Sequence, residues 1–571
     1  MLRGAADTVA ELPDSSDVLG RARREQVAFE NRRFRMFPLS PWGLAAGPCD
    51  EIVGRFCTWH GDSDWIPVPE PASVSDLRDR FVAYLDSVQA LLPGDGWILG
   101  QRVWYRGEAG RWVEALDATV GCGAESWWCA SLRGFALHGL GRYPEAKTAF
   151  GEALQSMDPE TARRWRDTRW LLFPDARRAL ERAAEGEGEA AVERLWLLAD
   201  PLFLVPGNDR ETEHYARWTV ATLRTNARNP FRISWRRDLE ELTVRMGWEI
   251  GWERAQGASG QESVVGHHHP EGRDFFPTAN AMIDPASAGP EGFLAGRDRP
   301  RTLYAPAVAP VLLPMDAQVA VFPRGDQVVV VATHFLPADT GRDVARDSLR
   351  PWMAPGEQAD QAHRAGLFLV PAAGGQPLSA EVTGQAEGAL VLRAPAGAYV
   401  LAAESWAPRL RRAGRLRMGV RCDTVPRDVA TLSDLLLLAP GVGEADSLEE
   451  VALRALPRPE IGVGGSVAVA WEINGLGWVP QTIGYEVSAE KVGAGVLRRA
   501  AQALGLMSPR TPLSLSWSEP GPSRPGVVLR QVELALGNAE PGEYAVVLRA
   551  RVPGRGVLTS RAALTVGGSE R

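Results

Sequence analysis

The sequence predicts a multi-domain α + β protein: helical repeats in the front half, a small α+β segment in the middle and two antiparallel β-sandwiches at the back. At 571 residues the chain is too long for one hydrophobic core. Apolar residues recur at helical spacing in the front half, and short apolar runs alternate with Gly/Pro turns in the back half. The expected regions are a helical region at 1–95, helical repeats at 96–184, the α+β segment at 190–300, and sandwiches at 301–445 and 456–567.

The composition is that of a folded globular protein and argues against two function classes. Hydrophobic residues make up 45% of the chain and charged residues 23%. The net charge of −8 is not that of a nucleic-acid binder, which usually carries a basic stripe. No run of about 18 apolar residues occurs, so we expect no membrane-spanning segment.

Four of the five cysteines form two close pairs, Cys49/Cys57 and Cys122/Cys129. Pairs of this kind close short loops and persist in oxidising compartments, so we expect two disulfides. Four cysteines allow three connectivities, and buried free thiols remain an alternative. Zinc is disfavoured because its structural sites use tighter C-x-x-C spacing. Cys422 has no nearby partner and is expected to be a buried small hydrophobe.

The cysteines also bear on the compartment. Residues 1–11 carry acids and no apolar core region, so they are not a signal peptide as they stand. The protein is therefore either cytoplasmic or preceded by a leader upstream of the given start. Disulfides favour the second reading, and we expect an extracytoplasmic location in the periplasm or cell envelope, with the cytoplasm as the alternative.

The clearest single helix is expected between Val74 and Leu92. Its apolar residues recur at steps of three and four, which is the pattern of an amphipathic helix. The run 93–96, Pro-Gly-Asp-Gly, ends it.

An internal repeat follows. The stretch Gly110–Ala115 recurs as Gly141–Ala146, 31 residues later. In the second copy Gly134, Ala146 and Ala153 occupy positions where small residues let paired helices approach, and Phe150 lies between them. With Pro159 shortly after, this copy resembles a tetratricopeptide repeat, whose period is about 34 residues. The resemblance implies a concave surface that binds peptides or proteins.

The middle segment carries a second resemblance. Its features are a Trp before Asp200-Pro201, then Pro206-Gly207-Asn208, then Glu211 and Tyr215-Ala216-Arg217, then Trp235-Arg236-Arg237-Asp238. In this order they resemble the GWxTD-domain family of bacterial proteins. Ser234 stands where the name motif has Gly, and Arg237 where it has Thr, so the chain is a divergent relative. The family implies export but no established activity.

The same segment can be interpreted from its residues alone. Asn208 or Asp209 can cap a helix that begins near Arg210. Asp238 can pair with an arginine or cap a loop. The strand expected between it and a turn at Gly247 is what the GWxTD resemblance implies.

The sequence of the back half predicts a series of strands. Val319–Phe322 and Gln327–Thr333, with Arg324-Gly325-Asp326 between them, predict a β-hairpin. Further strands are expected at 366–370, 390–392, 399–404, 466–473, 482–487, 513–517, 527–536, 544–552 and 558–566. Tyr399 and Tyr544 each open a late strand after a tight turn, which resembles the tyrosine corner of immunoglobulin-like folds.

No motif in the sequence predicts a catalytic centre, a metal site or a cofactor. His267-His268-His269 are consecutive on an expected loop, where one ion could take two of them at most, and no H-E-x-x-H pair is present. The G-x-S-x-G elbow of serine hydrolases is absent.

Tryptophan and arginine, the residue types that dominate binding hot spots, gather in two places. Candidates for a repeat groove are Trp104, Tyr105, Trp127 and Trp128. Candidates for a second binding surface are Trp235, Arg236, Arg237, Trp248 and Trp252. Core packing with arginine–carboxylate pairs is the alternative interpretation of the second group.

We therefore expect a non-catalytic binding or scaffold protein of the bacterial cell envelope, with a protein or peptide partner. The alternative is an envelope hydrolase whose carboxylates cannot be recognised from spacing. Converging carboxylates in a deep pocket would favour the hydrolase, and a shallow groove between repeat helices would favour binding.

Overall fold

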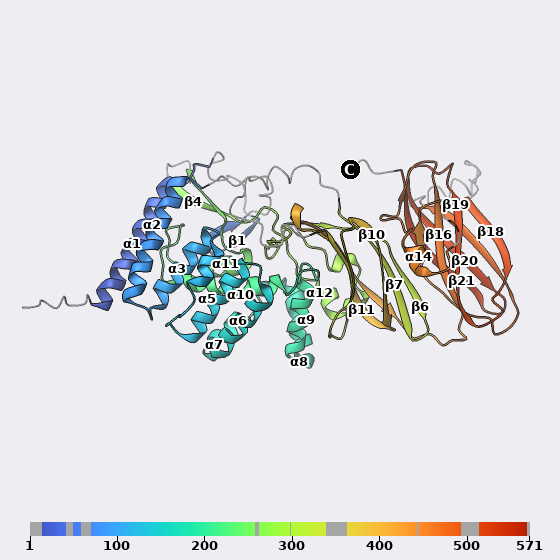
Figure 1. Cartoon of the computed structure of the whole chain (residues 1–571), viewed down its shortest axis with the longest axis horizontal. Coiled ribbons are helices and arrows are strands. Elements are labelled where there is room, and N and C mark those ends of the chain that lie inside the picture. Colours follow the sequence, from blue (N-terminus) through green and yellow to red (C-terminus); the bar gives the residue numbers. More distant parts are fainter. Residues whose placement is uncertain are drawn as a thin grey trace, which may run out of the picture.

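The computed structural model describes residues 14–40, 50–58, 70–256, 262–296, 299–337, 362–441, 443, 445–492 and 513–567. Over these residues the molecule is elongated, with helices at one end and stacked sheets at the other (Figure 1). The chain runs along this long axis from its N-terminal helices to its last sheets. The mixed helix-and-sheet class expected from the sequence is thus observed.

The described helices have the following bounds: α1 (Ser15–Met36), α2 (Ala72–Leu91), α3 (Gly96–Glu108), α4 (Trp112–Asp117), α5 (Ser126–Gly139), α6 (Tyr143–Ser156), α7 (Pro159–Arg166), α8 (Pro174–Glu187), α9 (Glu189–Ala199), α10 (Asp209–Thr225), α11 (Arg237–Met246), α12 (Ala279–Ile283) and α14 (Leu448–Ala452). Short 3-10 turns are η2 (Pro285–Ser287), η3 (Pro290–Gly292) and η5 (Pro408–Leu410).

The described strands have the following bounds: β1 (Glu51–Val53), β2 (Phe56–Thr58), β3 (Gly251–Gln256), β4 (Glu262–His267), β5 (Val311–Pro314), β6 (Val319–Arg324), β7 (Gln327–Phe335), β8 (Arg364–Pro371), β9 (Leu378–Thr383), β10 (Glu387–Pro395), β11 (Gly397–Ala407), β12 (Arg412–Cys422), β13 (Thr431–Leu432), β14 (Leu436–Leu438), β15 (Glu460–Ile461), β16 (Ser466–Leu476), β17 (Thr482–Lys491), β18 (Leu513–Pro520), β19 (Gly526–Ala535), β20 (Gly542–Val552) and β21 (Gly556–Val566).

The predicted amphipathic helix is confirmed as α2, which buries Val74, Leu77, Phe81, Leu85 and Val88 on one face. Phe81 stacks on Phe29 of α1 with ring centroids 5.2 Å apart. Helices α1 and α2 therefore pack against each other through their apolar faces.

The internal repeat has the same backbone geometry in both copies. Gly110 and Gly141 each have φ of 73°, in the left-handed region that favours glycine. Each donates its N–H, at 2.9 Å, to the carbonyl three residues earlier. Between α5 and α6, a methyl group at Gly134 would lie 2.8 Å from the Phe150 ring. A small residue at that position is therefore required for the two helices to pack.

In the middle segment one expectation is confirmed and one is wrong. Asn208 caps α10, since its side-chain oxygen accepts the N–H of Glu211 at 2.9 Å. Residues 237–246 form helix α11, not the expected strand. Leu239, Leu242 and Met246 recur at helical spacing and are buried together, so helix periodicity decides the structure of this segment.

The predicted hairpin is confirmed as β6 and β7, which pair antiparallel across the Arg324–Gln327 turn. Their sheet has the order β10-β7-β6 and packs on a five-stranded sheet of order β5-β12-β11-β8-β9. The second sandwich consists of a five-stranded sheet, β15-β21-β20-β17-β18, and a sheet in which β13, β14 and β19 all pair with β16. Strands β13 and β14 precede residue 445 but belong to this second sandwich.

Both sandwiches depart from a purely antiparallel arrangement. In the first, β5 pairs parallel with β12; in the second, β15 pairs parallel with β21. Each is a short edge strand formed by the chain as it enters the sandwich, so its direction is set by the preceding segment and not by a hairpin. The expected antiparallel description holds for the other pairings among the described strands.

Among the described strands, β7, β11 and β16 are each buried on both faces and connect neighbouring layers. Strand β11 faces the first sandwich through Leu401 and the helical part through Trp406. Strand β7 faces the first sandwich through Val330 and the second through Val331. Strand β16 likewise contributes to the second sandwich and to the junction with β7. Among the described residues, no helix is both long and apolar enough to span a bilayer.

Candidate binding cleft

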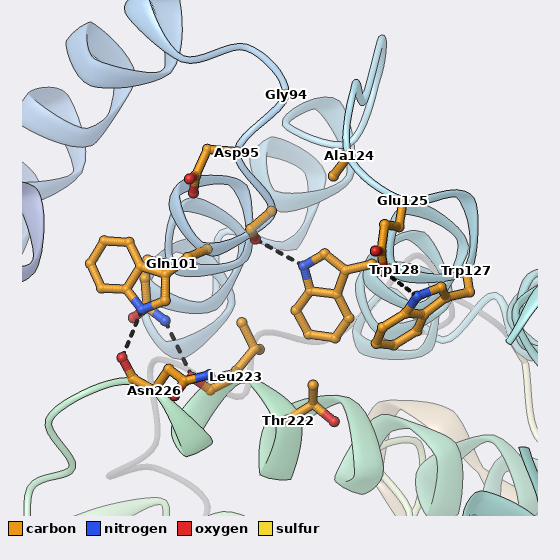
Figure 2. A pocket seen from close by; sticks show the side chains of 12 residues that line it. Gly94, Asp95, Gln101, Ala124, Glu125, Trp127, Trp128, Thr222, Leu223 and Asn226 are labelled. Carbon is orange, nitrogen blue, oxygen red and sulfur yellow. Dashed lines mark hydrogen bonds between the residues drawn. The ribbon is translucent and has the colours of Figure 1, made fainter. Parts of the chain in front are cut away.

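A cleft of about 400 Å³ opens between the N-terminal ends of α3 and α5 and the C-terminal end of α10. Figure 2 shows Trp127 and Trp128 pointing into it from α5, and Thr222, Leu223 and Asn226 forming its floor. Its volume lies within the range of about 300–1,000 Å³ typical of small-ligand and side-chain pockets. Its lining residues are Gly94, Asp95, Gly96, Trp97, Gln101, Ala124, Glu125, Trp127, Trp128, Thr222, Leu223 and Asn226.

Glycines on α3 allow the walls of the cleft to come together. A methyl group at Gly96 would lie 3.1 Å from the Trp128 ring. At Gly100 it would lie 2.6 Å from Leu223 of α10 and 3.1 Å from the same ring. Real Cβ atoms essentially never sit below 3.0 Å from a neighbour, so a larger residue at position 100 would require the Leu223 side chain to move. Asp95 caps α3 by accepting the N–H of Ile98 at 2.9 Å.

The three tryptophans that line the cleft have their indole N–H groups engaged. Trp97 donates to the Asn226 carbonyl at 3.0 Å, and Trp128 to the Gly96 carbonyl at 2.9 Å. Trp127 donates to the Glu125 carboxylate at 2.5 Å (Figure 2). The Trp127 and Trp128 rings lie 5.4 Å apart. The rings are thus held in place, and what they offer a ligand is their faces and edges.

A disulfide holds the α5 side of the cleft. Cys122, in the loop before α5, is bonded to Cys129 in its second turn, which confirms this pair. The bridge spans the lining residues Ala124 and Glu125. Cys57 is also disulfide-bonded, and Cys49 lies outside the described residues. Cys422 is a buried free thiol, as expected, and burial raises its pKa.

The charged groups that line the cleft are both carboxylates. Asp95 and Glu125 stand on opposite sides of it in Figure 2. Neither lysine, arginine nor histidine is among the lining residues. The cleft therefore combines aromatic faces with negative charge. The two carboxylates are separated and already engaged as acceptors, so they do not form a converging acid pair.

The four residues expected in a repeat groove divide into two pairs. Trp127 and Trp128 line the cleft. Trp104 and Tyr105 are buried in the helical core, with 8% and 1% of their surface exposed. The Tyr105 hydroxyl donates to Glu30 of α1 at 2.7 Å. Helix α3 packs against neighbours on nearly every side, which explains why its central aromatic residues are covered.

The second group does not converge on one surface. Trp252 is buried and stacks on Phe37, and Trp248 packs edge-on against Phe135 in the helical core. Trp235 is half-buried at the edge of the same core. Arg236 and Arg237 are exposed, and the Arg237 guanidinium lies 5.7 Å from the Trp170 ring centroid. Asp238 pairs with Arg55 at 2.6 Å, and hydrogen bonds from Arg55 lower its pKa to about 2.

Sequence reasoning missed Trp97, Asp95, Glu125 and the α10 floor of the cleft. The first two were within reach, because an aspartate that caps a helix and a tryptophan in its first turn lie together at the helix end. The α10 residues carry no comparable signal, since more than a hundred residues separate them from α3.

Helix α10 also contains the most concentrated group of buried ionisable side chains in the front half. Glu213 accepts Arg217 at 2.7 Å and lies 2.8 Å from His138. Burial opposes ionisation, but Arg217 and His138 hold the pKa of Glu213 at about 2. Asp209 accepts the Tyr304 hydroxyl at 2.7 Å, and burial raises its pKa to about 6. These side chains are at least nine-tenths covered, so this group packs α10 and does not face a ligand.

The three consecutive histidines lie in different surroundings. His267 is buried and lies 3.3 Å from Glu253, whereas the His269 ring accepts the N–H of Glu271 at 3.1 Å. Burial lowers the pKa of His268 to about 4. Among the described residues, no group of three or more His, Cys, Asp or Glu side chains is placed to hold a metal ion.

No family model and no curated protein matches the chain. Among solved structures it is similar to the FN1–FN3 domains of chicken CNTN1, at 10% identity and a TM-score of 0.15, over 45% of this chain and 68% of that one. It is also similar to red sea bream transglutaminase (10% identity, TM-score 0.15, 59% and 43% of the chains) and to Bacteroides uniformis β-glucuronidase (9%, 0.16, 43% and 26%). TM-scores this low support no argument about fold or function.

Proposed function

We propose that this chain is a non-catalytic binding protein that takes a protein or peptide segment into the cleft between α3, α5 and α10. The observation that carries the proposal is the set of three tryptophans lining that cleft with every indole N–H already bonded. Such rings are ordered before a ligand arrives, so binding costs little side-chain entropy. Tryptophan is also the residue type most enriched at binding hot spots.

The lining chemistry supports binding over hydrolysis. A hydrolase would need a nucleophile or activated water beside a base, with groups placed around a reacting atom. The cleft offers indole rings, amide groups and two separated carboxylates. The ionisable groups that do come together, around Glu213 and Asp209, are buried in the packing of α10.

We further propose that the front helices are tetratricopeptide-like, the middle segment is a divergent GWxTD-type domain and the sandwiches are immunoglobulin-like. The matching geometry at Gly110 and Gly141 supports the first. For the sandwiches, the Tyr399 and Tyr544 hydroxyls donate to carbonyls four residues upstream, each at 2.9 Å, as in a tyrosine corner. The Cys122–Cys129 disulfide supports a place in the cell envelope or periplasm, because such bonds persist in oxidising compartments.

Selection from a displayed peptide library tests the proposed function. Peptides selected on the intact chain should lose at least tenfold in affinity on a Trp97→Ala/Trp127→Ala variant. The matched control is Trp478→Ala, which removes an exposed tryptophan in the second sandwich and should leave affinity unchanged. Selected peptides that bind the cleft variant as tightly as the intact chain would contradict the proposal, as would a selection that yields no binder.

A further inference from the structure

We propose that the cleft recognises a positively charged side chain, an arginine or a lysine presented by an extended segment of the partner. This inference rests on the proposed binding function and adds the chemistry of the group bound. It follows from which hydrogen-bonding groups of the cleft are used, which charges line it, and how other tryptophans of the same helices are already occupied.

The tryptophans leave few donors for an anionic or carbonyl-bearing ligand. All three indole N–H groups are bonded to acceptors within the protein. The Gln101 amide donates to the Leu223 carbonyl at 3.4 Å, and the Thr222 hydroxyl to the Trp218 carbonyl at 2.9 Å. What the tryptophan, Gln101 and Thr222 side chains offer a ligand is therefore mainly π-faces and oxygen acceptors, which suit a cation.

The charge of the lining points the same way. Asp95 and Glu125 are the ionisable residues among those that line the cleft, and both are negative. They stand on opposite sides of the cleft in Figure 2, with the Trp128 ring between them, so a cation over that ring would be attracted by negative charge from two sides. An anionic group in the same place would meet two like charges with no base among the lining residues.

In the helical part, arginine guanidinium groups already lie over tryptophan rings at several places. The Arg23 guanidinium lies 5.6 Å from the centroid of Trp97 itself, although Arg23 does not line the cleft. Arg224 lies 5.0 Å from the Trp104 ring, and Arg164 lies 5.2 Å from the Trp218 ring. These internal pairs fall within the distance of about 6 Å at which cation–π attraction acts. An arginine from a partner would add one more pair of the same kind.

Two isosteric substitutions remove the negative charge and keep the structure. Asp95→Asn retains a side-chain oxygen that can cap α3, since Asn and Asp are equally good N-caps. Glu125→Gln retains an oxygen to accept the Trp127 N–H. The matched control is Asp175→Asn/Glu185→Gln on α8, which neutralises two exposed acids, one of them also in a first helical turn, away from the cleft.

The experiment titrates the full chain, labelled with 5-fluorotryptophan, with four N-acetylated, C-amidated tripeptides of sequence Gly-X-Gly. X is arginine, lysine, citrulline or glutamate; citrulline has nearly the shape of arginine without its charge. Fluorine NMR resonances of Trp97 and Trp127 are assigned by their replacement with Phe. The arginine peptide should shift these resonances and bind at least tenfold more tightly than the citrulline peptide.

The Asp95→Asn/Glu125→Gln variant should lose about tenfold in affinity for the arginine peptide, with little change for citrulline, whereas the α8 control should behave as the intact chain. Equal or tighter binding of citrulline or glutamate would overturn the inference. So would unchanged affinity in the double variant, or no shift with any of the four peptides.

The library experiment separates the two proposals. Selected peptides that depend on the cleft tryptophans but are not enriched in arginine or lysine would support the binding function. They would contradict the proposal that the cleft recognises a positively charged side chain. Selected peptides that do not depend on the cleft tryptophans would overturn both.

Discussion

The two junctions of the molecule are built in different ways. Where the helical part meets the first sandwich, Arg417 of β12 pairs with Glu404 of β11 at 3.3 Å, and both side chains are fully buried. Arg417 also donates to the Leu198 and Asp200 carbonyls at the end of α9. Where the two sandwiches meet, the contact is largely aliphatic and aromatic, with Phe322 and Val331 packed on residues of β14 and β16. A charge pair, between Arg324 of β6 and the buried Glu472 of β16, accompanies it.

This difference predicts how each junction responds to change. A buried charge depends on its partner, because an unpaired ion in the interior is costly. Burial raises the pKa of Glu404. It also lowers the pKa of Arg415, the residue opposite Glu404 on β12, to about 9. Burial thus disfavours the charged form of both side chains. An apolar junction depends on filled volume instead. The first junction should therefore be sensitive to single charge deletions, and the second to cavities.

Arg417→Ala should have the largest effect, lowering the free energy of unfolding by about 3–5 kcal/mol, because it leaves Glu404 buried without its counter-charge. Urea unfolding followed by circular dichroism measures it. The control is Arg549→Ala, which breaks a half-exposed pair with Glu490 in the second sandwich and should cost about 0–1 kcal/mol. Equal losses of unfolding free energy in the two variants would show that the buried Arg417–Glu404 pair matters no more to stability than an exposed pair.

Acid should destabilise the helical part through His214 on α10. Burial lowers the pKa of His214 to about 3, and its ring lies 2.7 Å from the Trp165 carbonyl. Because the unfolded histidine takes a proton below about pH 6.5 and the folded one does not, stability is full above that pH and falls as the pH drops. Between about pH 6.5 and 4.5 this group should remove about 2–3 kcal/mol.

The comparison that isolates this effect is with His214→Gln, whose stability should fall less over the same pH range. It is needed because Asp209, with its pKa raised to about 6, acts in the opposite direction as it gains a proton in the folded state. Parallel pH profiles for the two proteins would contradict the prediction.

Neighbouring valines on β7 test whether the sandwich junction is a true core. Val331→Ala opens a cavity at the junction, and Val330→Ala opens one inside the first sandwich. Both residues are fully buried, so each variant should lose about 2 kcal/mol of unfolding free energy. Thermal or urea unfolding measures both. If only Val330→Ala lowered the free energy of unfolding, the junction would not be a packed core that stabilises the fold.

The smallest expected effects concern the two tyrosine hydroxyls. Tyr399→Phe and Tyr544→Phe each delete one hydrogen bond to a carbonyl four residues upstream. Each should cost about 1 kcal/mol, the usual net contribution of such a bond. Because the two corners have the same geometry, the two losses should agree; a large difference in unfolding free energy would show that the corners are not equivalent.

Local patterns were sufficient to predict most elements. The hairpin of β6 and β7 follows from a turn of three residues between two apolar runs, and the repeat follows from two glycines in equivalent positions. At α11 the family resemblance implies a strand, whereas the spacing of Leu239, Leu242 and Met246 is that of the observed helix. Periodicity alone could not separate a covered aromatic residue, such as Trp104, from one that lines a cleft, such as Trp127.

What could not be predicted depends on contacts between distant segments. Arg415 and Arg417 alternate along β12 as solvent-facing residues would, and only the arrival of α9 from about 200 residues earlier buries them. The cleft is similar: Trp97 and Trp128 could be suspected from sequence, but the α10 residues that close its floor could not.

Strand β7, covered on both sides, limits how this chain can be divided or recombined. A fragment that begins after residue 425 would carry β14 and β16 without their cover and would present Leu436, Leu438 and Ala468 to water. Such a fragment should self-associate or require chaperones, although its own sandwich is complete. Gene fusion or exchange of the last module would thus have to carry a replacement for β6 and β7.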